Sequence, residues 1–562
     1  MNSFEKSKKF FLEGIELYSK QNYKEAVIKF TNSLELEPNR PSILLNLSKS
    51  YLQIKQLENA KYNLEKIIQL NGFENEKKEA LNLLLNIYFE IDDFEEINKL
   101  KNINNAREIF NNKDYVKLQF YYPKLFNSLE EIPNARNEFR GNIKKLLNDK
   151  YLPKLDLIDD PIIPPNFSLS YDGYDNLEIN KELISIYKKL YPKLNDEIGF
   201  SNNKNKKIKI GFISEFFTNH TIIKLFEGLI YKLDKSKFDV FVIYSDKTLP
   251  GSRYDEIKKN CILYNYENVF LPKNFSEKVE IIKEYNLDIL FYTDIHMSEN
   301  LYFLTLLKLA RYQITSWGHP ETTGNSKIDF FLSSTLLETD NFKKKYSEKV
   351  LLSKYLPMYF YKPKVINNLK DEMLVNKNVY SCPQNLIKMH PSFDFAIKEI
   401  LNKDKKAKVY FIKDKNENIT KKFSSRLKKN ISTNMDRVFF MDKLTVEEFI
   451  NNCGRSSVLL DPFIFGAGNS FHESMYYGTP TVTMPTDYLK SRIVTGAYKQ
   501  MEIDNAPIAK DLHEYVELSI EIANNGGLDL KKYYQEQANK NLFENEKAVK
   551  DLESIFFNIN NN

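Results

Sequence analysis

Hydrophobic and polar residues alternate with helical spacing through the first hundred positions of the chain. Between positions 14 and 38, the small residues Gly14, Ala26 and Ser33 stand with Phe30 at offsets that face a neighbouring helix. Small side chains there let two antiparallel helices approach closely. The pattern predicts a pair of packed helices that ends near Pro38.

The same arrangement returns after about 34 residues, which is the period of tetratricopeptide repeats. Ala60 takes the place of Ala26, and Leu47 and Tyr51 take the matching positions of the first helix. Two such repeats are therefore predicted. A third segment, residues 80–100, keeps the helical spacing but loses the signature positions, as a degenerate or capping repeat does. For any single repeat, the alternative is a pair of amphipathic helices that pack only on each other.

Helical spacing continues without repeat marks from Ile103 to Tyr151. Proline removes a backbone donor and disfavours helix at the residue before it. The next stretch is therefore predicted to be a linker or an extended wrapping segment, because it holds Pro153, Pro161, Pro164 and Pro165.

Further on, short β-branched and aromatic runs alternate with helical segments. The runs KIKIGFISEFF and FDVFVIYSD are typical of strands, and TIIKLFEGLIYKL between them has helical spacing. The rhythm continues in LDILFYTD, KIDFFLSS, AKVYFIKD, RVFFMD, SVLLDPF and TPTVTMP. This order predicts two successive α/β units, joined near residues 362–373. Ligands of such sheets bind beyond the carboxyl ends of the strands, here in the cleft between the units.

Length and composition agree with several domains. At 562 residues the chain is too long for one core, and 42% hydrophobic residues suffice for packed cores. We divide it into helical repeats (residues 1–102), a helical extension with a proline-rich linker (103–200), a first α/β domain (201–365) and a second α/β domain with terminal helices (366–562).

Net charge and cysteine content limit the kinds of ligand and site that the protein is expected to have. The 81 Lys and Arg against 76 Asp and Glu give a net charge of +5, which suits anionic ligands but gives no argument for nucleic acid. Cys261, Cys382 and Cys453 are far apart and favour neither disulfides nor a zinc site. The first residues lack the apolar run of a signal peptide, and no segment has the roughly 20 apolar residues of a membrane span. We expect a cytoplasmic protein without a membrane span.

The stretch DPFIFGAGNSFHESMYYGTPTVTMP, residues 461–485, places small residues in a strand-to-helix turn. Gly466 and Gly468 permit a positive φ and close approach by a phosphate. Free amides at the start of the helix favour an anion there. Glu473, about one turn further, is placed to accept hydrogen bonds from sugar hydroxyls. The alternative is a glycine turn needed only for tight helix–sheet packing.

Three other segments carry candidate chemistry. Lys388 follows a predicted strand and can neutralise a leaving diphosphate, although a solvated surface charge is the alternative. His220 begins a helix and can act as a general base or hydrogen-bond donor, or as a structural polar residue. A segment from Asp294 holds the single tryptophan, Trp317, in the loop WGHPETTG with His319.

Familiar catalytic motifs are missing from the sequence. No Asp-x-Asp motif follows a strand of the two α/β units, which disfavours a divalent-metal mechanism. The chain also lacks GxxxxGK[ST], GxSxG and HExxH.

Five motifs in order, ISEFFTNH, WGHPETTG, YSEKV, CPQNLIK and FGAGNSFHESMYYGTPTVTMP…LKSRI, resemble those of the O-GlcNAc transferase and SPINDLY-like glycosyltransferases, particularly bacterial members. The similarity spans residues 207–543, with tetratricopeptide repeats ahead of it as in that family. The resemblance implies a GT-B fold of two Rossmann-like domains, with the acceptor side in residues 201–365 and the nucleotide-sugar side in 366–562. It also implies inverting, metal-independent transfer of a sugar from a nucleotide diphosphate to Ser or Thr of a protein.

The resemblance assigns individual residues as well. His220 matches a histidine of the active-site loop, and Lys388 matches the lysine that contacts the diphosphate. Asp294 is the second candidate for acting on the acceptor hydroxyl. The nucleotide-sugar ligands it implies are Asn385, Gly468, Asn469, Ser470, Phe471, Glu473, Phe449, His319 and Arg492. The implied donor is UDP-GlcNAc or another UDP- or GDP-sugar, without metal or other cofactor, and the repeats would bind the acceptor polypeptide.

Departures from the family pattern leave the donor open. Phe216 replaces an acidic residue, Thr221 replaces a proline, and Gly468 stands where animal enzymes place a histidine. Phe449 takes the position of a histidine that stacks on the base, which an aromatic ring can still do. Two alternatives remain: a hexosyl- or fucosyltransferase acting on protein Asn or on a glycan, and an adaptor that has lost catalysis.

Overall fold

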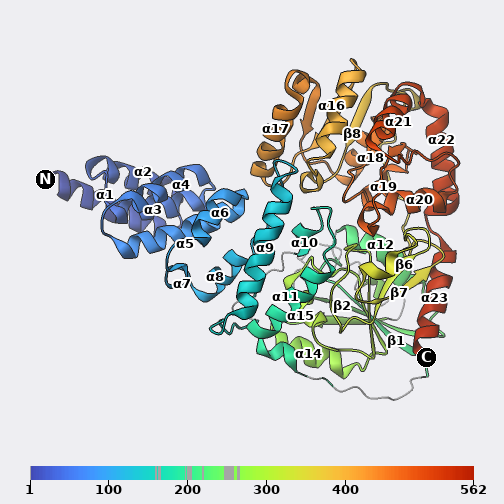
Figure 1. The fold of residues 1–562 in the computed structure, drawn as a ribbon, viewed down its shortest axis with the longest axis horizontal. Coiled ribbons are helices and arrows are strands. Elements are labelled where there is room, and N and C mark those ends of the chain that lie inside the picture. Colours follow the sequence, from blue (N-terminus) through green and yellow to red (C-terminus); the bar gives the residue numbers. More distant parts are fainter. Residues whose placement is uncertain are drawn as a thin grey trace. The chain divides into compact units, whose positions relative to one another are not determined.

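The computed structural model describes residues 2–157, 161–162, 166–196, 198, 206–217, 220–245, 259–261 and 266–561. The chain forms two compact units, Met1–Pro123 and Lys124–Asn562. Figure 1 labels their helices and strands. Pro164 and Pro165 of the expected linker lie outside the described residues.

The first unit is entirely helical within the part that the structure describes. Its helices are α1 (Ser3–Ser19), α2 (Tyr23–Leu36), α3 (Pro41–Gln53), α4 (Leu57–Gln69), α5 (Glu74–Ile91), α6 (Phe94–Lys101), α7 (Ala106–Ile109) and α8 (Asn112–Gln119). Small residues mark the contacts between paired helices. A Cβ on Gly14 would stand 2.6 Å from the Phe30 ring, and Ala26 and Ala60 are fully buried. The helical repeats expected from the sequence are confirmed.

The second unit begins with helices α9 (Glu131–Asn148), α10 (Asn166–Leu169) and α11 (Leu177–Leu190). A seven-stranded parallel sheet follows in the order β3-β2-β1-β4-β5-β6-β7. Its strands are β1 (Ile208–Ile213), β2 (Phe238–Ser245), β3 (Glu267–Leu271), β4 (Ile289–Tyr292), β5 (Tyr312–Ser316), β6 (Phe330–Ser334) and β7 (Lys349–Ser353). Helices α12 (Thr221–Lys232), α14 (Phe275–Glu284) and α15 (Glu299–Thr305) lie between them in the chain.

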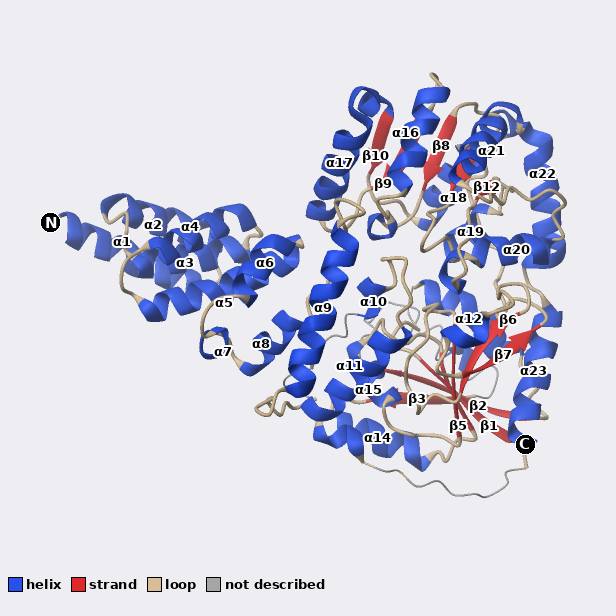
Figure 2. Ribbon diagram, in the orientation of Figure 1, coloured by secondary structure: helices blue, strands red, loops and turns tan. Residues whose placement is uncertain are grey.

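A second parallel sheet has five strands in the order β10-β9-β8-β11-β12. The strands are β8 (Val379–Cys382), β9 (Lys408–Ile412), β10 (Val438–Met441), β11 (Val458–Leu460) and β12 (Thr481–Val482). The helices that follow them are α16 (Phe393–Lys403), α17 (Glu417–Ile431), α18 (Val446–Arg455), α19 (Asn469–Ser474), α20 (Ile493–Met501), α21 (Leu512–Asn525), α22 (Gly527–Gln537) and α23 (Glu546–Asn561). Figure 2 shows the two sheets apart from each other, each flanked by helices, as two Rossmann-like domains require.

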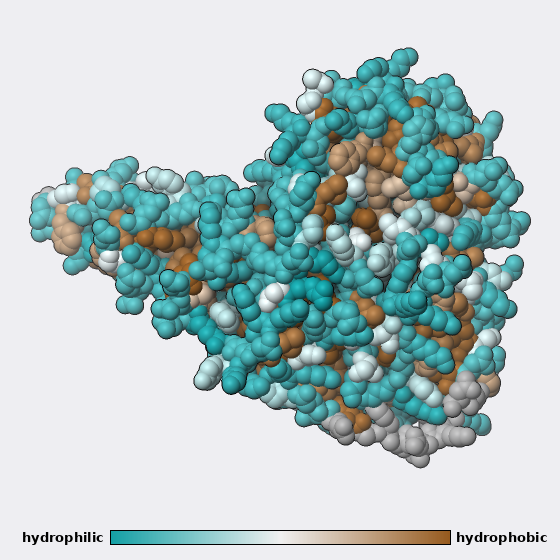
Figure 3. Space-filling view, in the orientation of Figure 1, coloured by the Kyte–Doolittle hydropathy of each residue, from teal (hydrophilic) through white to brown (hydrophobic). Residues whose placement is uncertain are grey.

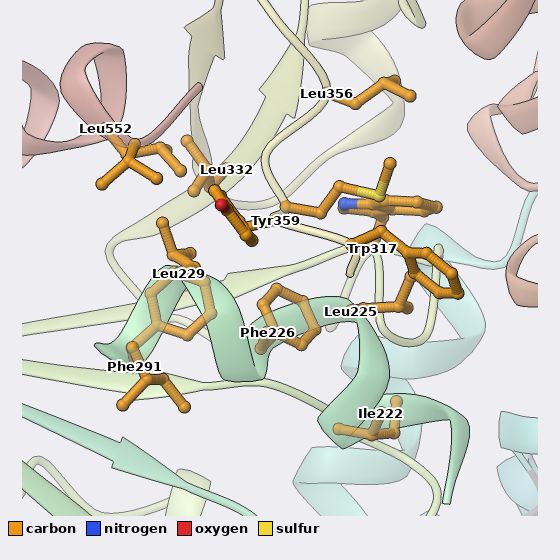
Figure 4. Packing of buried hydrophobic residues seen from close by; sticks show 14 of the residues in the cluster. Ile222, Leu225, Phe226, Leu229, Phe291, Trp317, Leu332, Leu356, Tyr359 and Leu552 are labelled. Carbon is orange, nitrogen blue, oxygen red and sulfur yellow. The ribbon is translucent and has the colours of Figure 1, made fainter. Parts of the chain in front are cut away.

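A large apolar core fills the first of these domains. Figure 4 shows Ile222, Leu225, Phe226 and Leu229 of α12 packed among Phe291, Leu332, Trp317 and Tyr359. Leu552 of α23 joins the same core, and Asp551 of that helix accepts a hydrogen bond from the Ser353 hydroxyl at 2.8 Å. The helix α23 therefore packs on the first sheet although it follows the second in the chain.

One face of the molecule is mostly polar. Hydrophilic residues cover most of the face in Figure 3. None of the described helices combines the length and the apolar character needed to cross a membrane.

Candidate active site

A cavity of about 390 Å³ lies between the two Rossmann-like domains. The first domain contributes residues near the start of α12 and in the loop after β5, namely Thr221, Ile222, Leu225, Trp317, Gly318 and Pro320. The second domain contributes Pro383, Gln384, Asn385, Lys388, Phe449, Phe465, Gly468, Asn469, Ser470, Glu473 and Ile493. Seven residues expected from the sequence thus meet in one cavity: Asn385, Lys388, Phe449, Gly468, Asn469, Ser470 and Glu473.

The turn after β11 is organised by a buried carboxylate. Asp461 accepts hydrogen bonds from the Ala467 amide at 2.6 Å and from the Thr483 hydroxyl at 2.7 Å. A Cβ on Gly466 would stand 2.9 Å from Oδ2 of Asp461. Burial raises the pKa of Asp461 to about 7. Gly466 is therefore needed because the Asp461 carboxylate approaches its backbone.

Gly468 has a different role in the same turn. It lines the cavity, and a Cβ there would meet only Ile493, at 3.9 Å. The absence of a side chain leaves open space where the cavity meets the first residues of α19. The positive φ that the sequence suggested for Gly466 and Gly468 occurs at neither of them. It occurs at Gly478, with φ +65°, where the backbone carbonyl of Lys531 in α22 leaves no room for a Cβ.

Lys388 brings a positive charge to the cavity wall. Its Nζ donates to the Gln384 side-chain oxygen at 3.1 Å and to the Gly466 carbonyl at 3.0 Å. The same atom lies 4.8 Å from the centroid of the Phe465 ring. Gln384 in turn donates to the Ser470 hydroxyl at 2.6 Å, which ties the lysine to the start of α19.

The pKa of Lys388 reflects this setting. Desolvation by the surrounding protein lowers it to about 8, although the nearby Asp461 opposes the shift. No carboxylate of the described residues forms an ion pair with Lys388. An incoming anion would therefore find a cation that is not neutralised by direct contact.

Glu473 joins the two domains across the cavity. Its Oε1 accepts from Lys224 Nζ of α12 at 2.5 Å, with side chains 9% and 22% exposed respectively. Phe449, a half-buried residue of α18, lines the same cavity. Asn385 is exposed, and its side-chain oxygen accepts from the Ile387 amide at 3.2 Å.

His220 caps the N-terminus of α12. Its Nδ1 accepts from the Ile222 amide at 3.3 Å, and its ring packs on Phe216 with centroids 4.6 Å apart. Burial, with smaller contributions from Lys415 and Lys224, lowers its pKa to about 4. The imidazole is therefore neutral near pH 7. Because Nδ1 accepts a hydrogen bond, Nε2 carries the hydrogen and is a donor. His220 itself is next to the cavity-lining Thr221 rather than among the lining residues.

Two other expected residues lie buried behind the cavity wall. Asp294 accepts from the hydroxyls of Ser214 and Thr293, and burial raises its pKa to about 7. His319 contacts His296 through Nδ1 and the Ser170 hydroxyl through Nε2, both at 3.2 Å. Neither residue lines the cavity.

Phe471 and Arg492 also lie away from the cavity surface. Phe471 is 1% exposed and belongs to the apolar core. Arg492 donates to the Leu337 carbonyl at 2.6 Å and to the Thr486 carbonyl at 3.2 Å, which links the second domain to the first.

Several cavity residues were not found from the sequence. Gln384 and Phe465 lie within the recognised motifs CPQNLIK and FGAGNSF but were given no role. Phe167 and Tyr171 come from the segment interpreted as a linker or wrapping segment. Its aromatic residues were the one signal available. Within the described residues, no group of three or more His, Cys, Asp or Glu side chains could hold a metal ion.

Comparisons with known proteins bear on the class of this cavity. No family model matches the sequence. A probable UDP-N-acetylglucosamine–peptide N-acetylglucosaminyltransferase SPINDLY of Solanum lycopersicum is 23% identical over 385 residues, 66% of this chain and 40% of that protein. A UDP-glucose:protein N-β-glucosyltransferase of Actinobacillus pleuropneumoniae serotype 5b is 26% identical over 284 residues, 46% of this chain and 43% of that protein. The chain thus spans about two fifths of the length of these relatives.

Among solved structures, a mutant of the Thermobaculum terrenum O-GlcNAc transferase matches 100% of this chain and 98% of its own, with a TM-score of 0.66 at 14% identity. The fold is therefore that of a GT-B glycosyltransferase preceded by tetratricopeptide-like repeats, as the sequence predicted. The chain is thus similar in sequence to the SPINDLY proteins and similar in fold to a bacterial O-GlcNAc transferase.

Proposed function

We propose that the protein is an inverting, metal-independent glycosyltransferase that moves GlcNAc from a nucleotide diphosphate donor to Ser or Thr of a protein. The observation that carries this proposal is Lys388. It places an ammonium in the interdomain cavity, beside the start of α19, and no carboxylate among the residues that the structure describes pairs with it directly. A departing diphosphate needs such a charge, and a site that excludes water makes it more effective.

The chemistry is a single displacement. The acceptor hydroxyl attacks the anomeric carbon on the face opposite the leaving nucleotide, so the configuration inverts, and the proton of the hydroxyl is released to solvent. The bond between the anomeric carbon and the diphosphate oxygen breaks, and its electron pair leaves with the nucleotide. Lys388 stabilises that charge as it develops. His220 orients the acceptor through its Nε2–H, because its other ring nitrogen is engaged by the Ile222 amide.

The nucleoside occupies the end of the cavity at Glu473 and Phe449. A carboxylate accepts hydrogen bonds from ribose hydroxyls, and Glu473 keeps one oxygen for this while the other is held by Lys224. The Phe449 ring offers a face on which a base stacks. We assign the acceptor polypeptide to the helical repeats.

A second candidate is transfer of a hexose to protein Asn. It is favoured by the relative named UDP-glucose:protein N-β-glucosyltransferase, which matches 46% of this chain. Both candidates use the same cavity and the same leaving group, and they differ in sugar and acceptor.

Nucleotide binding is the first test. The purified protein is titrated in a thermal-shift assay with UDP, GDP, UDP-GlcNAc, UDP-glucose and GDP-fucose in the presence of EDTA, beside Lys388→Ala. We expect stabilisation by one base family, with loss of the effect in the variant. Absence of any shift in the wild-type protein would refute the glycosyltransferase proposal and favour the adaptor. The donor so identified is then incubated with acceptor protein, and glycosylated peptides are mapped to Ser, Thr or Asn.

A further inference from the structure

The segment between α9 and α11 supplies part of the cavity wall. Phe167 and Tyr171 line the cavity together with Phe465 of the second domain. Tyr171 packs on Phe465 with ring centroids 5.0 Å apart, and Phe167 stacks on His319 at 5.4 Å. We call Phe167, Tyr171 and Phe465 the aromatic wall. Two of its three rings belong to neither Rossmann-like domain.

The segment that carries Phe167 and Tyr171 is held in place by several polar contacts. Arg136 of α9 pairs with Asp172 at 2.5 Å and donates to Asn176 at 2.7 Å. Ser170 contacts His319 of the first domain at 3.2 Å. Arg136 also lies 5.1 Å from the Tyr174 ring. The aromatic wall is therefore a built surface with a fixed position at the cavity.

The two ends of the cavity differ in chemistry. Glu473 also lines a neighbouring cavity of about 490 Å³, in which neither Lys388 nor any residue of the aromatic wall takes part. Lys388, in contrast, lies against the Phe465 ring. The diphosphate site at Lys388 thus adjoins the aromatic wall, whereas Glu473 marks the end that opens toward the second cavity.

The difference between the two ends of the cavity determines where the ribose, the diphosphate and the sugar of the donor lie. With the ribose at Glu473 and the diphosphate at Lys388, the group beyond the diphosphate meets the aromatic wall. In a nucleotide sugar that group is the hexose. Hexose rings expose C–H groups on one face, and aromatic faces, which carry partial negative charge, attract them.

We propose that the aromatic wall is the subsite for the hexose of the donor; this rests on the proposed function. Tyr171 is 6% exposed as a residue, and it lines the cavity. Its phenolic hydroxyl is both a donor and an acceptor, and it pairs with a hydroxyl group of the sugar. Tyr171 and Phe167 are thus specificity-determining residues for the sugar and not for the nucleotide.

The test compares each nucleotide with its own sugar conjugate by isothermal titration calorimetry, using the pairs UDP/UDP-GlcNAc, UDP/UDP-glucose and GDP/GDP-fucose on the full chain. In Tyr171→Leu and Phe167→Leu we expect the Kd of the bound nucleotide sugar to rise about tenfold, while the Kd of the free nucleotide stays within twofold. Tyr171→Phe should lose part of the affinity, because only the hydroxyl is removed. Tyr151→Leu, an exposed tyrosine of the preceding helical region that does not line the cavity, is the control and should change neither Kd.

Two results would overturn the assignment. An equal rise for nucleotide and nucleotide sugar would make the aromatic wall a support of the fold or of the nucleotide. Unchanged binding of both, with a raised KM for acceptor protein alone, would place these rings on the acceptor side. Failure of the proposed function looks different, because the wild-type protein would then bind neither member of any pair.

Discussion

At the scale of single residues, the role proposed for Lys388 can be tested most directly. Lys388→Met keeps the length of the side chain but removes the charge, so we expect kcat to fall about tenfold or more while the melting temperature stays close to that of the wild type. The matched control is Lys403→Met, which removes a surface ion pair with Glu517 and does not line the cavity. Unchanged turnover in Lys388→Met would remove this lysine from the mechanism.

The pKa of Lys388 gives a second prediction. With a pKa of about 8 in the free protein, the ammonium is lost as pH rises through 8. A bound diphosphate favours the charged form and raises that pKa, so nucleotide binding at pH 8.5 should take up protons and weaken as pH rises further. Calorimetry in two buffers of different ionisation enthalpy measures the uptake. The same uptake in Lys388→Met would contradict the assignment to this residue.

Glu473 allows the proposed nucleoside end of the cavity to be tested separately. Glu473→Ala removes the proposed ribose contact, and hydrogen bonds to charged groups are worth about 1.5–3 kcal/mol. We expect at least tenfold weaker binding of the nucleoside diphosphate and unchanged binding of inorganic pyrophosphate, both by calorimetry. Lys224→Met serves as a companion variant, because it removes the partner and leaves the carboxylate. Equal losses for both ligands would show a general effect on the fold.

Local motifs explain which residues the sequence could reveal. Lys388, Gly468 and Glu473 follow strands whose positions are readable, so their meeting at one cavity was predictable. The need for glycine at position 466 was not, because it depends on where the Asp461 carboxylate turns. The position of Tyr171 could not be predicted for a similar reason. Its segment is held by Arg136, which belongs to a separate helix.

At the scale of elements, the turn after β11 contains one glycine that packing requires, Gly466, and one that borders the cavity, Gly468. Gly466→Ala forces a methyl group to within 2.9 Å of Asp461, which must then give up hydrogen bonds to Ala467 or Thr483. We expect a loss of about 1–3 kcal/mol in the free energy of unfolding, measured with urea.

Gly468→Ala is the counterpart of that variant. Its new methyl group meets only Ile493, at 3.9 Å, but stands in the cavity. Stability should stay near that of the wild type while nucleotide affinity falls. A reversal of the two phenotypes would refute the separate roles of the two glycines.

The strands differ in how clearly the sequence predicts them. The runs that became β1, β2 and β4 are apolar and β-branched, as buried parallel strands require. The segments that became β3 and β7 were not picked out, because each of these edge strands is only five residues long and is largely not buried. The buried strand β5 was not predicted, because its sequence YQITS contains polar residues.

At the scale of the whole molecule, the division into two compact units allows the proposed donor and acceptor roles to be tested separately. Removal of Met1–Pro123 leaves the unit that contains the cavity intact in sequence. We expect the truncated protein to bind the nucleotide with unchanged Kd and to lose transfer to acceptor protein. Full transfer by the truncated protein would contradict the role assigned to the repeats.

The attachment of α23 to the first sheet has a consequence for synthesis on the ribosome. The hydrogen bond between Ser353 and Asp551 joins residues 198 positions apart, and Leu552 and Phe556 complete the core around α12. At about 5–20 residues per second, α23 emerges roughly 10 to 40 seconds after the sheet that it covers. During that interval an apolar face of the nascent first domain is exposed. The second domain must therefore fold before the last helix of the first domain is available.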